Sequence, residues 1–202
     1  MFVEVLVIVE TSVTATVGPI TGGTTSLVIS SNAWTFGWGP EGELTSMSKS
    51  GYSASYAYDG LGRRVKSTIG GTTNVYVYSG LSVLYETNPA TSYVYAAGLR
   101  LARIQGSTTE YYHNDHLGNV RLVTHGTTGN VLSAIAYKPF GLPVVVTGSE
   151  PTYGYTGEYR ESAPNLVYLH SRWYDPTIGR FLSPDDLCRR GSPWMGRLAE
   201  AS

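Results

Sequence analysis

The sequence predicts an all-β protein, organised as a winding antiparallel sheet of strand–turn–strand repeats. The first reason is composition: 16 tyrosines and 24 glycines occur in 202 residues, and only 14% of the residues are charged. Such a composition is typical of aromatic strands joined by tight turns. The second reason is a short phrase around an aromatic residue, which recurs along the chain and separates segments of alternating apolar and polar residues.

The aromatic residues of this phrase recur at nearly constant spacing. A fixed period is typical of repeat architectures, in which each unit buries one face only when neighbouring units stack on it. Two series are visible, the first with a spacing of 20 residues and the second with spacings of 18 and 19: Trp38, Tyr58 and Tyr78, then Tyr137, Tyr155 and Tyr174.

The phrase has turn residues at fixed positions. Asp59 and Asp115 each open a copy, and a glycine follows three residues later. An aspartate here accepts hydrogen bonds from backbone N–H groups two residues on, and glycine adopts the positive φ that reverses the chain. A further copy at residues 174–181 has one more residue before its glycine. We therefore assign structural turn roles to Asp59, Gly62, Asp115, Gly118 and Gly179.

Short alternating segments lie between the turns, and no segment before the tail has helical periodicity. Residues 2–9 are apolar apart from Glu4, and we expect a strand there as well. They are too short to cross a bilayer and lack the basic start of a signal peptide. The clearest alternating segments are residues 74–78, 81–85, 93–95, 99–104 and 131–137.

Charge and cysteine content exclude several classes of protein. Proteins that bind nucleic acids usually have a strongly basic surface, whereas this chain has a formal net charge of −1. We therefore expect no nucleic-acid partner. The single cysteine, Cys188, excludes an intrachain disulfide and a zinc site built from cysteines. We also predict no cofactor and no membrane span.

The phrase from Tyr58 to Arg64 resembles the YD repeat of RHS proteins. Residues 113–121 and 137–141 resemble the last RHS repeat, and residues 155–185 are similar to the RHS repeat-associated core domain. The resemblance implies four segments: a β-rich, unassigned stretch at 1–30, YD-repeat strands at 31–110, the core domain at 111–187 and a divergent tail at 188–202.

In RHS proteins the repeats wind into a hollow β-cage, and the core domain spirals inward to plug one end. The resemblance therefore implies a structural role, as a segment of a shell that encloses or presents a C-terminal toxin. Its partners would be the remaining repeats of the parent shell and the enclosed effector, and open sheet edges would favour self-association. The parent protein would be secreted or displayed on the bacterial cell surface. The tail is too short to be an effector itself.

A second interpretation is an aspartic-type self-cleaving core domain. The resemblance places the candidate catalytic residues at Glu161, Asp175 and Asp185, with Arg160 beside them. Two carboxylates held close together can divide the roles of acid and base, because one keeps its proton while the other activates water. The chain departs from the family's cleavage phrase at residues 185–187, and Glu161 stands where the family usually has aspartate. The structural alternative is that the aspartates cap turns and pair with arginines.

Two further interpretations concern binding. Tyrosine rings stack on sugars, which favours a glycan-binding adhesion module. However, alternating tyrosines are also common in β-sheets, where they pack against side chains of the neighbouring strands. His113, Asp115, His116 and His125 are residue types that bind metals. However, His113 and His116 lie three apart and would point to opposite faces of a strand. We therefore predict no metal site, and we expect Cys188 to be a bystander thiol.

Overall fold

The computed structural model describes residues 7–8 and 34–184. The all-β prediction is confirmed, because these residues form an antiparallel sheet of 13 strands, a second sheet of four strands and one short 3-10 helix, η1 (Tyr155–Gly157). Most of residues 1–30 lie outside the described residues, as do Asp185, Cys188 and the tail.

We call the 13-stranded sheet the wall. Its strands pair in sequence order, so the wall is one long antiparallel meander. Its strands are β1 (Val7–Ile8), β2 (Trp34–Trp38), β3 (Leu44–Lys49), β4 (Tyr52–Tyr58), β5 (Arg64–Ile69), β6 (Thr72–Ser79), β7 (Ser82–Thr87), β8 (Ala90–Ala96), β9 (Leu99–Gln105), β10 (Thr108–Asn114), β11 (Val120–His125), β12 (Val131–Tyr137) and β13 (Pro143–Gly148).

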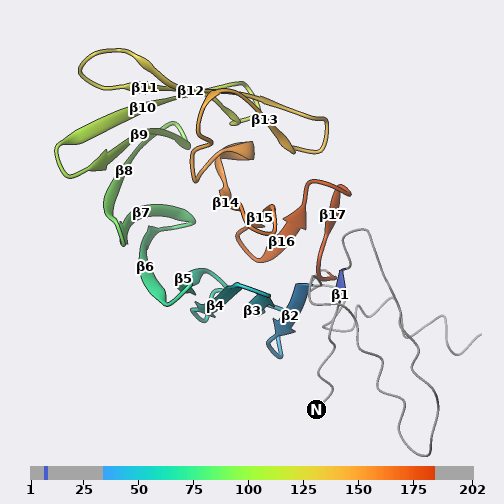
Figure 1. Ribbon diagram of the computed structural model, residues 1–202. Helices are drawn as coiled ribbons and strands as arrows, with labels where there is room; N and C mark the ends of the chain where they lie inside the picture. Colours follow the sequence, from blue (N-terminus) through green and yellow to red (C-terminus); the bar gives the residue numbers. More distant parts are fainter. Residues whose placement is uncertain (1–6, 9–33, 185–202) are drawn as a thin grey trace, which may run out of the picture.

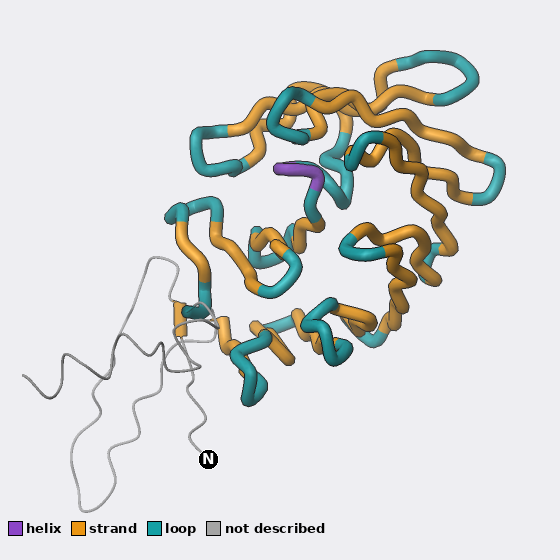
Figure 2. The backbone as a smooth tube through the Cα atoms, turned by 180° about the vertical axis from the view of Figure 1, so that it is seen from behind, coloured by secondary structure: helices purple, strands orange, loops and turns teal. Residues whose placement is uncertain are grey.

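The wall curves into an arc, and the four-stranded sheet lies on its concave side (Figure 1, Figure 2). We call this second sheet the inner sheet. After β13 the chain passes through η1 and turns back into the arc, so the inner sheet follows the wall in sequence but packs inside it. Its strands are β14 (Tyr159–Glu161), β15 (Leu166–Leu169), β16 (Arg172–Asp175) and β17 (Arg180–Phe181).

A ladder of side-chain hydrogen bonds joins successive hairpins of the wall. In every second hairpin one residue, which we call the anchor, lies opposite a residue at the start of the next strand, as with Tyr58 opposite Arg64 and Tyr78 opposite Val83. A β-bulge lies directly beside the anchor at Tyr58, Tyr78, Tyr95 and Asn114, but not at Tyr137. From Tyr58 onward, the anchor also donates to the backbone carbonyl of the equivalent strand-start residue in the preceding hairpin. The donations run from Tyr58 Oη to Leu44 O (2.8 Å), Tyr78 Oη to Arg64 O (2.8 Å), Tyr95 Oη to Val83 O (2.9 Å), Asn114 Nδ2 to Arg100 O (3.0 Å) and Tyr137 Oη to Val120 O (3.0 Å).

The ladder corrects the second predicted series of aromatic anchors. Only Tyr137 of that series lies on the wall, because Tyr155 lies in η1 and Tyr174 on β16 of the inner sheet. The anchors between the two series are Tyr95 and Asn114, which the constant spacing did not reveal. Hairpins of different lengths still bring an anchor opposite the turn, so the hydrogen bond does not require a fixed period.

Removing one hydroxyl of the ladder should weaken the wall measurably. We expect Tyr78→Phe to lower the free energy of unfolding by about 1 kcal/mol, because the carbonyl of Arg64 loses its donor. Urea denaturation measures the change. Tyr111→Phe is the matched control, since this ring is 47% exposed on the wall, and its loss should be near zero. Equal losses for the two variants would contradict a structural ladder.

Candidate functional site between the wall and the inner sheet

One face of the inner sheet is buried against the wall. Strand pairing puts Tyr159 opposite Tyr168, and Tyr168 opposite Trp173, and all three side chains are buried. Because alternate residues of a strand share a face, Glu161 and Asp175 lie on this same face, and they are only 6% and 7% exposed. The inner sheet therefore presents to the wall an aromatic row and, beside it, a row that contains two carboxylates.

The aromatic row closes over a single cation on β5 of the wall. The side chain of Arg64 is 1% exposed, and its Nε and Nη1 atoms have no hydrogen-bond partner among the described residues. Ring faces hold the cation instead. The distances from the guanidinium carbon to the ring centres are 3.9 Å for Tyr159, 4.7 Å for Tyr76, 4.8 Å for Tyr168 and 5.5 Å for both Tyr56 and Trp173.

Hydrogen bonds fix the register of this contact. The backbone N–H of Arg64 donates to Tyr168 Oη at 2.9 Å, and that hydroxyl donates to the carbonyl of Gly62 at 3.2 Å. Trp173 Nε1 donates to Tyr58 Oη at 3.2 Å. The inner sheet is therefore attached to the turn that carries the clearest copy of the repeat phrase.

A second arginine makes a related contact from β9. The guanidinium carbon of Arg100 lies 3.5 Å from the ring centre of Tyr153. Its Nη1 donates to the carbonyl of Gly157 at 2.7 Å, and its Nε donates to Tyr95 Oη at 2.9 Å. Because Tyr153 and Gly157 lie in the segment around η1, Arg100 holds the part of the chain that leads into the inner sheet.

Sequence reasoning did not identify either arginine as a candidate residue. The equivalent strand-start positions of other hairpins carry buried apolar residues, Leu44, Val83 and Val120. The sequence did contain a signal for these two sites. At each of them an arginine stands where neighbouring repeats have an apolar side chain. This signal could have been found by aligning the copies of the phrase on their turns.

The turn at Asp59 shows how the repeat phrase works. Asp59 Oδ1 accepts hydrogen bonds from the backbone N–H groups of Leu61 and Arg63, both at 3.0 Å, and Gly62 has a φ of 76°. The side chain of Arg63 also donates to Asp59, and this bond holds the pKa of the carboxyl below its ordinary value. Arg63 Nη1 donates to the carbonyl of Gly80 at 2.8 Å and so connects this turn to the next.

The turn at Asp115 has an asparagine in place of the arginine. Asp115 Oδ1 accepts from the backbone N–H groups of Leu117 and Asn119 at 3.0 Å, and Gly118 has a φ of 82°. Burial acts to raise the pKa of Asp115, but the hydrogen bonds from Asn119 and Leu117 outweigh it and hold the pKa below its ordinary value.

Two of the predicted catalytic carboxylates, Glu161 and Asp175, lie on the same face of the inner sheet, but each accepts a hydrogen bond from a different donor. Glu161 accepts a hydrogen bond from Tyr159 Oη at 2.9 Å. Asp175 accepts the backbone N–H of Thr177 at 2.8 Å, in a turn that Gly179 closes with a φ of 67°. Because β15 lies between their strands, the two backbones are roughly 10 Å apart.

The other two predicted catalytic residues do not join this pair in the described part of the chain. Arg160 lies on the opposite face of β14, where it pairs with Glu150 and donates to Asn165. Asp185 lies outside the described residues, so its place beside the other carboxylates stays a prediction.

The residues considered as metal ligands are spread over β10, β11 and the turns next to them. His113 Nε2 lies 3.0 Å from Thr124 Oγ1, and His125 Nδ1 accepts the backbone N–H of Thr127 at 3.2 Å. The carboxylate of Asp115 already accepts hydrogen bonds from the backbone of its own turn. Within residues 7–8 and 34–184, no three His, Cys, Asp or Glu side chains are placed to hold a metal ion.

A histidine–glutamate pair lies beside the contact made by Arg100. His170 Nε2, in the turn between β15 and β16, lies 2.9 Å from Glu158 Oε1. The hydrogen bond with Glu158 raises the pKa of His170 above its ordinary value of 6.5, although burial acts in the opposite direction. Protonated His170 therefore connects the end of η1 to the inner sheet.

This pair predicts a pH-dependent part of the stability. Because the pKa is raised in the folded state, the stabilisation is full below the unfolded value and is lost as the pH rises through the folded value. We expect His170→Gln to lower the free energy of unfolding at about pH 5.5 and to have little effect at about pH 8.5. Urea denaturation at both pH values measures this, with His113→Gln as control. A loss at His170 that does not change with pH would contradict the prediction.

The arc-shaped meander with a sheet turned back inside it defines the class as an RHS-type shell protein. A family model described as teneurin YD-shell matches residues 26–192. The chain therefore belongs to the YD-shell family. None of the described helical segments is long and apolar enough to span a membrane.

Relatives support this assignment across most of the chain. The tRNA3(Ser)-specific nuclease WapA of Bacillus spizizenii is 33% identical over 170 residues, which cover 77% of this chain and 7% of that protein. Teneurin-1 of Gallus gallus is 31% identical over 151 residues, 67% of this chain and 6% of that protein. The crystal structure of TcdB2-TccC3 matches with a TM-score of 0.58 at 22% identity and shows the same fold, covering 75% of this chain and 9% of that one. The chain thus spans less than a tenth of the length of these relatives.

Proposed function

We propose that this chain forms the end of a YD shell, in which the inner sheet closes the opening of the curved wall. The observation that carries the proposal is the enclosure of Arg64 by rings from both sheets. The contact fixes the inner sheet inside the arc rather than beside it. The division between repeats at 31–110 and core domain at 111–187 belongs to the same proposal.

We further propose that the shell encloses or presents a C-terminal polypeptide of the toxin type, in a secreted or cell-surface protein. Two comparisons support this proposal: the relationship to WapA, which is named as a tRNA nuclease, and the fold shared with TcdB2-TccC3. The remaining repeats of the shell and the enclosed polypeptide would be the partners. Self-association through the open edges of the wall and the absence of a nucleic-acid partner stay predictions.

Electron microscopy of the gene product, purified from its own cells, tests the shell function. We expect a hollow particle with this chain at one end and with the inner sheet inside the wall. A solid particle, or one in which the wall stays open beside the inner sheet, would overturn the proposal.

Self-cleavage is a second candidate function. The observation that favours it is the burial of Glu161 and Asp175 on one face of the inner sheet. Intact mass spectrometry during a long incubation tests it, with Glu161→Gln and Asp185→Asn as comparison. A full-length mass that stays unchanged in the parent chain rejects it.

The adhesion alternative also stays a prediction. The tyrosines on which it depended largely face the concave side or form the ladder, and among them Tyr56, Tyr76, Tyr93 and Tyr168 are buried. Buried rings offer no face to a sugar, so a glycan array tests the tyrosines that stay accessible, such as Tyr111, which is 47% exposed.

A further inference from the structure

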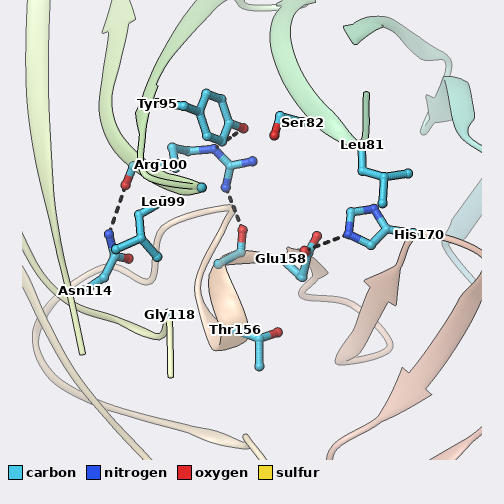
Figure 3. Close-up of a pocket in the computed structure, with 12 residues that line it drawn as sticks. Leu81, Ser82, Tyr95, Leu99, Arg100, Asn114, Gly118, Thr156, Glu158 and His170 are labelled. Carbon is cyan, nitrogen blue, oxygen red and sulfur yellow. Dashed lines mark hydrogen bonds and ion pairs between the residues drawn. The ribbon is translucent and has the colours of Figure 1, made fainter. Parts of the chain in front are cut away.

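A polar cavity of about 240 Å³ lies where the turns of the wall meet the inner sheet (Figure 3). Ser82 and Leu99 line it from the wall, and Glu158 and His170 line it from the segment around the inner sheet. Arg100 also lines this cavity (Figure 3). The cavity is separate from the carboxylates considered for self-cleavage.

One nitrogen of Arg100 is left for a ligand. The residue is only 7% exposed, and its Nε and Nη1 atoms are used by Tyr95 and Gly157. The third nitrogen, Nη2, has no acceptor among the described residues and points into the cavity toward Ser82 (Figure 3). This is a nearly buried donor with an open space in front of it.

The guanidinium carbon of Arg100 lies 3.5 Å, 5.0 Å and 5.1 Å from the ring centres of Tyr153, Tyr93 and Tyr95, but its charge has no carboxylate partner among the described residues. Within the part of the chain that the structure describes, no carboxylate lies within 4.0 Å of its guanidinium. The nearby carboxylate of Glu158 is already paired with His170 at 2.9 Å. Burying an unpaired charge is costly, and an anion that entered the cavity would relieve this cost.

We propose that the cavity binds a small carboxylate, which accepts hydrogen bonds from Arg100 Nη2 and the hydroxyl of Ser82. A single carboxylate fits better than a phosphate, because only one guanidinium nitrogen is open and the negative charge of Glu158 is close. The cavity is smaller than the roughly 300–1,000 Å³ of sites for drug-sized ligands. It therefore accepts one acidic group, carried by a peptide side chain or by an acidic sugar.

Isothermal titration calorimetry of the full chain tests the proposal with matched probes. N-acetylaspartate amide and glucuronate represent the two sources of carboxylate, with N-acetylasparagine amide and glucose as their neutral counterparts. We expect at least one acidic probe to bind and neither neutral probe to do so. The acidic probe that binds identifies the source. Inorganic phosphate should bind more weakly than that probe.

Two variants connect the binding to the cavity. Arg100→Gln should abolish it, and Ser82→Ala, which removes only a hydroxyl, should weaken it roughly 5-fold. Ser79→Ala is the control, since Ser79 faces Ser82 across the turn but does not line the cavity. No binding of either acidic probe to the wild-type chain would overturn the proposal. So would tighter binding of phosphate, or an affinity that Ser82→Ala leaves unchanged.

Discussion

Replacing Trp173 by alanine should lower the free energy of unfolding by about 3–5 kcal/mol, the range for removing a large buried aromatic side chain. Trp173 is 1% exposed, and its ring centre lies 5.1 Å from that of Tyr56 on the wall and 5.4 Å from that of Tyr168 on the inner sheet. The substitution also removes the hydrogen bond to Tyr58 Oη. The contact between the two sheets therefore loses its largest side chain.

The inner sheet should separate from the wall in this variant. Its strands contain only two to four residues each, and sheets of this size need packing partners to be stable. Urea denaturation and near-ultraviolet circular dichroism measure the effect. Ile178→Ala, in the turn of the same sheet and 57% exposed, should change stability by less than about 0.5 kcal/mol. A loss below about 1 kcal/mol for Trp173→Ala would contradict the packing described here.

Arg64→Ala should have an effect of similar size, about 3–5 kcal/mol. Arg64 fills the space between five rings, and alanine would leave a cavity there as well as remove the cation–π contacts. Arg64→Met refills much of the volume without the charge, and the equivalent positions hold Leu44 and Val83. We therefore expect methionine to recover most of the loss.

Comparing Arg64→Ala with Arg64→Met separates the contribution of packing to the free energy of unfolding from the contribution of the charge. Replacing a buried charge by an apolar side chain of similar volume is often nearly neutral, so Arg64→Met should remain within about 2 kcal/mol of the wild type. Urea denaturation of both variants, with the exposed Lys66→Ala on the same strand as control, measures the difference. If methionine were as destabilising as alanine, the charge rather than the volume would hold the inner sheet.

The sequence predicted the wall better than the inner sheet, for a physical reason. The turn phrase is local, because Asp59 and Gly62 act within one hairpin, and a meander needs only local pairing. The copy at residues 174–181 has the same local chemistry, yet its hairpin belongs to the inner sheet. What places it there is contact with Arg64, more than a hundred residues away in sequence, and no local pattern encodes that contact.

The candidate site was predictable only in part. Glu161 and Asp175 were selected by resemblance, but their common face follows from the register of β14, β15 and β16, which the sequence did not specify. Arg64 and Arg100 were missed because each looked like one more charged residue in a strand. Their significance depends on facing inward, where neighbouring repeats place apolar side chains.

Hydrogen–deuterium exchange of the purified chain tests most directly whether the inner sheet is packed inside the wall. The peptide covering residues 166–175 should be protected as strongly as the peptide covering residues 52–58, because β15 and β16 can persist only against the wall. In Trp173→Ala the first peptide should lose its protection before the second. Rapid exchange of residues 166–175 in the wild-type chain, with the wall still protected, would contradict the arrangement and the function proposed from it.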